Sequence, residues 1–178
     1  MIFFCIDKGV RVLFASSEIV PFASTGGLGD VCAALPKALA KLDVEMYRIM
    51  PLYRVIDRHH YQIQPMDVVL LIPIGKTVYQ GRLFKQEYEG VTTFYIHCPE
   101  YFDRDGIYGD PHQEYSDNFE RFLFFQKAIV IAIDTLDLHP DVVHCNDWHT
   151  GLLPLLLKYG IDGTPRFGPE KTVMTIHN

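Results

Sequence analysis

The chain has 178 residues, of which 48% are hydrophobic and 21% are charged, a balance that is typical of one folded domain and excludes a disordered tail. Its formal net charge of -6 argues against a nucleic-acid-binding surface, which needs an excess of basic residues. No apolar run is long enough to cross a membrane or to act as a signal peptide, so we expect a cytoplasmic protein that binds neither membranes nor nucleic acids.

In chain order, the first elements are a strand, a helix and a second strand. The apolar run 10–15 predicts a buried strand, and the amphipathic run 31–39 predicts the helix that follows it. Polar and apolar residues alternate over 43–51, which indicates a second strand. Three β-rich runs come next without a helical pattern between them, so they predict an antiparallel meander inserted beside the other strands. These runs are 66–74, 77–87 and 91–97.

The second half of the chain begins with a long loop over 99–113, and loops of this length are usually functional or mobile. Asp117, with Glu120 three residues later, has the pattern of a helix start. Apolar residues at helical spacing extend this helix to about Leu138, and we expect its phenylalanines, from Phe119 onward, to lie in the core.

Two further strand-and-loop units complete the chain. The short apolar run 141–145 predicts a strand. The leucine-rich run 152–159 predicts a helix that ends at Gly160 and has Pro154 in its first turns. A last strand is expected over 171–176. The four cysteines form no C-x-x-C pair and stand beside apolar neighbours, so we expect them to be buried free thiols.

This alternation predicts a doubly wound, Rossmann-like α/β domain with a mostly parallel sheet, in which the β meander is an insertion and residues 1–178 form a single domain. In such sheets, ligands bind beyond the carboxyl ends of the strands. Three polar segments stand at predicted strand ends, namely 24–30, 146–149 and 177–178. We therefore expect these segments to meet at one edge of the sheet.

The segment 24–30 reads Ser-Thr-Gly-Gly-Leu-Gly-Asp and lies between the first strand and the first helix. Its glycines remove side chains where backbone N–H groups converge at a helix N-terminus, which is a favourable place for a phosphate. The spacing matches neither the dinucleotide fingerprint nor the P-loop. A plain, tight strand-to-helix connection is therefore the alternative interpretation of the segment taken alone.

Four groups of residues follow one another in a recognisable order. They are 17–23 with 25–31, 101–104 with 106–108, 141–144 with 146–149, and 175–178. In this order, and over about residues 12–178, the chain resembles the bacterial glycogen synthase and plant starch synthase family.

The resemblance implies the N-terminal half of a two-domain GT-B glycosyltransferase. Enzymes of this family transfer glucose from ADP-glucose to the non-reducing end of an α-1,4-glucan and retain the anomeric configuration. The implied partners are thus a nucleotide sugar and an α-glucan, and no cofactor or metal is expected, because cationic side chains and N–H groups can neutralise the departing ADP. The family's C-terminal nucleotide-binding domain is absent from this chain, so we expect the chain alone to be inactive.

The resemblance also implies roles for particular residues. His177 is expected beside the transferred glucose, as the catalytic residue. The family usually has a lysine immediately before Thr-Gly-Gly-Leu, whereas Ser24 stands there in this chain and supplies no charge to the donor phosphates. The implied donor-binding residues are Glu18, Ser24, Thr25, Gly26, Gly27, Asp30 and Asn178, and the implied acceptor- and sugar-binding residues are Tyr108, Asp147, Trp148 and His149.

Two other functions remain open at this stage. One is a non-catalytic glucan-binding or regulatory module with the same fold, and the other is a GT-B enzyme that uses another nucleotide sugar, such as UDP-glucose. A zinc site at His144, Cys145 and His149 is disfavoured, because their spacing fits no standard ligand pattern. Trp148 and His177 also have a structural interpretation, as a half-buried aromatic residue and a strand-end histidine.

Overall fold

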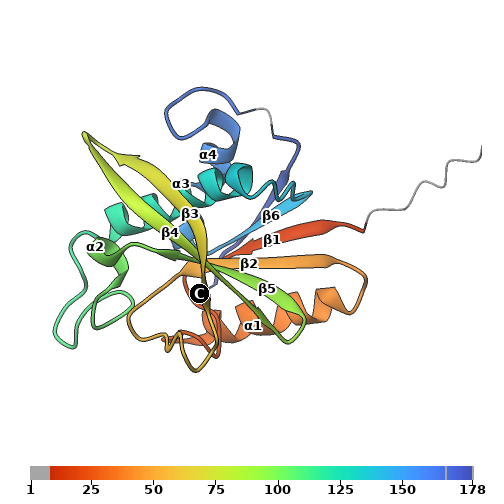
Figure 1. Cartoon of the computed structure of the whole chain (residues 1–178), viewed down its shortest axis with the longest axis horizontal. Helices are drawn as coiled ribbons and strands as arrows, with labels where there is room; N and C mark the ends of the chain where they lie inside the picture. Colours follow the sequence, from red (N-terminus) through yellow and green to blue (C-terminus); the bar gives the residue numbers. More distant parts are fainter. Residues whose placement is uncertain (1–8, 167, 178) are drawn as a thin grey trace, which may run out of the picture.

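The computed structural model describes residues 9–166 and 168–177, and Figure 1 shows one sheet with helices on both of its faces. Among these residues, seven strands form the sheet in the order β3-β4-β5-β2-β1-β6-β7. All the predicted strands are present, and their ends differ from the predictions by at most two residues. The strands are β1 Arg11–Ala15, β2 Glu45–Pro51, β3 Gln64–Ile74, β4 Thr77–Tyr88, β5 Val91–His97, β6 Val142–Asn146 and β7 Lys171–Thr175.

The sheet is mostly parallel. Strand β1 pairs in parallel with β2 and β6, β2 pairs in parallel with β5, and β6 pairs in parallel with β7. Strands β3, β4 and β5 pair antiparallel, which confirms the predicted meander. Residues Leu13, Phe14 and Ala15 of β1 are fully buried, as expected for a central strand that is covered on both faces. The carboxyl ends of β1, β6 and β7 therefore lie side by side.

Helices cover both faces of the sheet, with α1 on one side and α3 and α4 on the other (Figure 1). This arrangement confirms the doubly wound fold class. Helix α4 has Pro154 in its first turn and is followed by Gly160, whose φ of 74° favours glycine. The helices are α1 Gly27–Ala40, α2 Pro99–Phe102, α3 Asn118–Thr135 and α4 Leu153–Tyr159, with a short 3-10 helix at Trp148–Thr150.

Helix α3 begins directly after Asp117, where the sequence predicted a helix start. Asp117 precedes the helix, but its side chain makes no capping hydrogen bond. Its carboxylate instead accepts two hydrogen bonds from Arg104, at 2.8 and 2.7 Å. Glu120 accepts a hydrogen bond from the hydroxyl of Tyr101 at 2.5 Å. The predicted helix start is therefore confirmed, although Asp117 and Glu120 bind side chains of α2 and of the loop that follows it, and the helix ends at Thr135 rather than near Leu138.

The expectation that Phe119 belongs to the core is wrong. Its side chain is 68% exposed, whereas Phe122 and Phe125 are buried. Successive residues of a helix are rotated by about 100°, so only some positions of the first turn can face the sheet. The inward position of this turn belongs to Arg121, which is fully buried.

Three of the cysteines are buried free thiols, as predicted. Burial raises the pKa of Cys32, Cys98 and Cys145 to about 12 in each case. Cys5 lies outside the described residues. Within residues 9–166 and 168–177, no helix has the length and hydrophobicity that a membrane-spanning segment needs.

Candidate functional site

A cavity of about 690 Å³ opens at the carboxyl ends of β1, β6 and β7. Its wall combines the start of α1, the loop before α3 and the segments that follow β6 and β7. Gly26, Gly27, Asp147, Trp148 and His177 all line it. The polar segments that were predicted to meet at one edge of the sheet therefore do meet there, although they are far apart in the sequence.

The buried carboxylate of Glu18 fixes the glycine loop by hydrogen bonds. Its side chain is 3% exposed and accepts hydrogen bonds from the N–H groups of Thr25 (2.5 Å) and Gly26 (3.3 Å) and from the Thr25 hydroxyl (2.9 Å). A buried carboxylate is stable only with such donors, and it fixes the loop that supplies them. Because these two N–H groups are already bonded, an anion at this helix end has to use the next ones, on Gly27 and Leu28.

Tyr108 connects Glu18 with the loop before α3. Its hydroxyl donates to Glu18 Oε1 at 2.6 Å, and its backbone carbonyl accepts from Asn118 Nδ2 at 2.8 Å. Burial is the main cause that raises the pKa of Tyr108, so the hydroxyl keeps its proton and continues to donate. Asn118, the first residue of α3, thus helps to position Tyr108, and Tyr108 in turn binds Glu18.

Three of the predicted donor-binding residues do not line the cavity. The Ser24 hydroxyl donates to the backbone carbonyl of Gly26 at 2.9 Å. Thr25 is bonded to Glu18, and Asp30 is exposed in the first turn of α1, where the helix dipole favours a carboxylate. Asn178 lies outside the described residues.

Asp147 has a strained backbone. Its φ of 61° and ψ of 180° fall in a region that is essentially restricted to glycine. Its carboxylate accepts from the N–H of Trp148 at 2.9 Å, and its own N–H donates to the carbonyl of Thr175 at 2.8 Å. The segment after β6 is thereby tied to β7. Strain of this kind persists only where the surroundings enforce it, and it is concentrated at functional sites.

Trp148 and His149 form an aromatic wall of the cavity. Trp148 is 52% exposed, and its ring centroid lies 4.0 Å from that of His149, which in turn stacks on Tyr108 at 4.7 Å. Burial lowers the pKa of His149 to about 4, so its ring is neutral at pH 7. An exposed aromatic ring next to a carboxylate suits a sugar, whose apolar face packs on the ring while its hydroxyls donate.

His177 follows β7 and faces the same cavity. Its Nε2 lies 3.1 Å from Oδ1 of Asn146, the last residue of β6. The structure therefore places His177 beside the end of β6, in the wall of the cavity that the glycine loop also lines.

Glu114 and Asn118 line the cavity but were not predicted from the sequence. Both belong to the region around the start of α3, which the sequence marks only as a long loop followed by a helix. The length of that loop was the available signal. The bond between Asn118 and Tyr108 joins residues ten positions apart and depends on the folded path of the loop.

The charged residues of the cavity wall are carboxylates. Glu18, Glu114 and Asp147 line it, and no lysine or arginine of the described residues does. Among the described residues of this wall, the positive feature that a diphosphate would meet is the N-terminus of α1. An uncharged polyol would meet hydrogen-bond acceptors and aromatic faces, so the wall by itself favours a sugar over a nucleotide.

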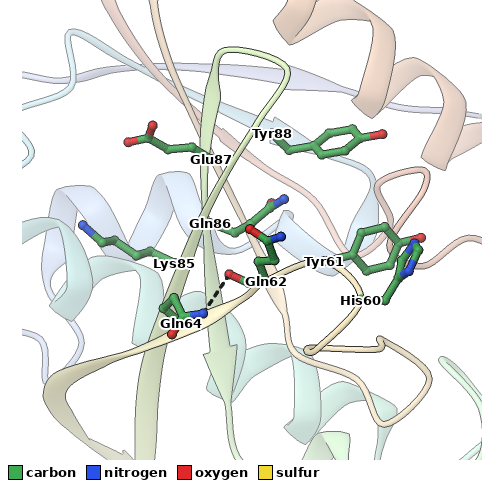
Figure 2. Close-up of a pocket in the computed structure, with 8 residues that line it drawn as sticks. All are labelled: His60, Tyr61, Gln62, Gln64, Lys85, Gln86, Glu87 and Tyr88. Atoms are coloured by element: carbon green, nitrogen blue, oxygen red, sulfur yellow. Dashed lines mark hydrogen bonds between the residues drawn. The ribbon is translucent and has the colours of Figure 1, made fainter.

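A second hollow, of about 570 Å³, lies between the segment 60–64 and the end of β4, and Figure 2 shows the side chains that line it. Its side chains are polar and aromatic, and Tyr61 donates from its hydroxyl to the carbonyl of Pro21 at 2.9 Å. None of the predicted site residues lines this hollow. It lies apart from the cavity, and the two share no lining residue.

The family follows from comparison with known proteins. The family model described as the starch synthase catalytic domain matches residues 11–178. The chain belongs to this family. Glycogen synthases from Syntrophotalea carbinolica and Aeromonas salmonicida are 38% and 41% identical over 169 residues, which is 95% of this chain and 35% of each relative. The chain thus spans about a third of the length of the curated relatives that it matches.

A solved structure supports the same relationship. The catalytic domain of starch synthase IV from Arabidopsis thaliana, bound to ADP and acarbose, superimposes with a TM-score of 0.80 at 28% sequence identity. The match covers 96% of this chain and 34% of that one. The mixed sheet with its antiparallel meander is therefore the fold of a glycogen and starch synthase domain.

Proposed function

We propose that this chain is the N-terminal domain of a two-domain, retaining glucosyltransferase that moves glucose from ADP-glucose to the non-reducing end of an α-1,4-glucan. Family membership, relatives named glycogen synthase and a related structure that holds ADP and acarbose support the proposal. One observation carries it furthest. The glycine loop, the strained Asp147 with Trp148, and His177 all face one cavity at the edge of the sheet.

In this proposal the chain supplies mainly the sugar side of the reaction. Glucan and glucose hydroxyls donate to the carboxylates of Asp147 and Glu114, and an apolar sugar face packs on Trp148. His177 contacts the transferred glucose as positive charge develops on its C1 atom. Fixed positions for these groups lower the barrier, because the reactants are oriented before the bond breaks.

The donor diphosphate needs more than this chain offers. Negative charge grows on ADP as the bond to glucose breaks, and positioned cations and N–H groups stabilise it. The free N–H groups at the start of α1 can contact a phosphate, but the wall has no lysine or arginine among its described residues, and Ser24 is uncharged. The proposal therefore assigns the cationic groups to a second domain.

The test uses the complete enzyme, in which this chain is joined to the C-terminal domain of the same reading frame. With labelled ADP-glucose and glycogen, the proposal predicts label in the polymer and little transfer from UDP-glucose. Preference for UDP-glucose would contradict the assigned donor. Binding of glycogen without transfer from either donor would instead favour a glucan-binding module, which the carboxylate-rich wall also suits.

A further inference from the structure

The side chain of Asn146 contacts both the central strand β1 and His177 of the candidate site. Its side chain is 1% exposed, so it is shielded from any ligand in the cavity. Its Nδ2 lies 3.1 Å from the carbonyl oxygen of Ala15 and 3.2 Å from that of His144. A carbonyl oxygen can only accept a hydrogen bond, so the nitrogen of the amide has to face these two strands. The oxygen and the nitrogen of a side-chain amide have nearly the same shape, so the shape alone does not tell them apart. The hydrogen bonds to the two carbonyls show which of them is the nitrogen.

The amide oxygen then faces His177. Oδ1 of Asn146 lies 3.1 Å from Nε2 of the ring, and an amide oxygen cannot donate, so Nε2 has to carry the hydrogen. In the neutral ring this leaves Nδ1 as an acceptor. A sugar hydroxyl that meets His177 at Nδ1 therefore has to donate its hydrogen to the ring.

We propose that Asn146 is a positioning residue for His177, which it holds in one orientation and in one tautomer, with the hydrogen on Nε2. The expected effect of Asn146 on glucose transfer rests on the proposed function, whereas the tautomer of His177 does not depend on it. A neighbouring contact shows the contrast. Nε2 of His144 lies 2.8 Å from the hydroxyl of Thr175, and because a hydroxyl both donates and accepts, that contact fixes no tautomer.

The tautomer can be measured on the chain by ¹⁵N–¹H correlation spectroscopy with labelled histidine at alkaline pH. The wild-type chain is expected to show His177 as a single Nε2–H species. Asn146→Ala removes the acceptor and should give a mixture of tautomers. Asn146→Asp keeps an acceptor and should keep the Nε2–H form, although it too loses the donor to Ala15 and His144. Thr175→Val is the matched control, since it removes the contact to His144 and should leave His177 unchanged.

A purely structural role for Asn146 predicts equal behaviour of the alanine and aspartate variants, and equal tautomer ratios in the two would overturn the inference. An Nδ1–H form of His177 in the wild-type chain would overturn it without any variant. In the complete enzyme, Asn146→Ala should lower kcat by about 10- to 100-fold and leave KM for ADP-glucose within about twofold. A fixed tautomer in an enzyme without transfer activity would refute the proposed function and leave this inference standing.

Discussion

The cavity at the ends of β1, β6 and β7 and the hollow beside β4 have similar volumes, about 690 and 570 Å³. They differ in how the chain builds them. The hollow takes its lining from two stretches, 60–64 and 85–88, and the side-chain amide of Gln64 bonds only the nearby carbonyl of Gln62 (Figure 2). The cavity joins segments that are distant in the sequence, and buried polar groups such as Glu18 fix their relative positions.

The volume of a cavity therefore does not identify the functional site in this molecule. A buried carboxylate and a strained Asp147 backbone both cost free energy, and a fold retains them where other interactions enforce them. The cavity has both features, whereas the described residues that line the hollow include no buried carboxylate but do include one positive φ, of 54° at Gln62. In the hollow, the buried Gln86 is simply bonded by the hydroxyl of Tyr95 at 3.3 Å. We therefore expect substitutions in the cavity to change activity or stability strongly, and substitutions in the hollow to change them little.

The largest effect is expected for His177→Ala in the complete enzyme. If His177 contacts the reacting sugar as proposed, its loss should lower kcat by about 10²- to 10³-fold, while the lost bond to Asn146 should cost only about 1 kcal/mol of stability. Steady-state kinetics and urea unfolding measure the two quantities. Comparable losses of activity and stability would make His177 a structural residue.

The next effect concerns pH. Burial lowers the pKa of His149 from 6.5 to about 4 in the folded chain, so the unfolded chain binds a proton that the folded chain does not between these values. Stability should therefore fall by about 3 kcal/mol as the pH decreases from 6.5 to 4. Urea unfolding as a function of pH measures this slope.

The matched variant is His149→Gln, which cannot take up the proton. Its stability should depend less on pH over the same interval, and the dependence that remains belongs to groups such as His97 and His144, whose pKa values burial also lowers. An unchanged slope would show that His149 is not buried as a neutral ring.

Glu18→Gln tests the support of the glycine loop. An amide cannot accept every hydrogen bond that the carboxylate receives from Thr25, Gly26 and Tyr108, so we expect a loss of about 2 kcal/mol. Hydrogen exchange at the amides of Thr25 and Gly26 should become at least about tenfold faster. The same change at the exposed Glu87 of the hollow should alter stability by less than about 0.5 kcal/mol. Equal losses of stability for Glu18→Gln and Glu87→Gln would contradict the difference between the cavity and the hollow.

A smaller gain is expected for Ser24→Lys in the complete enzyme. If position 24 approaches the donor phosphates, a lysine there adds a charged contact, which should lower the Kd for ADP-glucose by about tenfold. Equilibrium binding at two salt concentrations measures it, since a charge-based gain should shrink at high salt. Unchanged affinity would mean that position 24 does not approach the phosphates.

The smallest effect is predicted in the hollow. Lys85→Ala removes an exposed side chain at its rim and should change kcat and KM with glycogen by less than about twofold. A large rise in KM would show that the hollow contributes to glucan binding.

Most of the fold could be predicted from the sequence because its signals are local. Alternation along 43–51 and helical spacing after Phe119 depend only on neighbouring residues. The meeting of the glycine loop with Asp147 and His177 was also predictable, because the carboxyl ends of parallel strands share one edge of a sheet.

The remaining features depend on partners that are distant in the sequence. Asp117 is a residue type that often caps a helix, but its carboxylate binds Arg104 instead. The sequence does not show whether such a carboxylate binds the nearby helix N–H groups or a side chain from another segment. Phe119 is as apolar as Phe122, yet the position of the loop decides which of them is covered. The left-handed backbone of Asp147 is also set by its surroundings, namely by the bond to Thr175 of β7.

Binding of glucan in the cavity beside the glycine loop can be tested directly on this chain. Trp148 is the chain's single tryptophan and is half exposed in the cavity wall, so its fluorescence reports directly on that site. Titration of the chain with maltoheptaose is predicted to give a saturable change in Trp148 emission, which Asp147→Asn weakens and Lys85→Ala leaves unchanged. Emission that stays constant at millimolar maltoheptaose, or a response that Lys85→Ala abolishes and Asp147→Asn does not, would contradict the account.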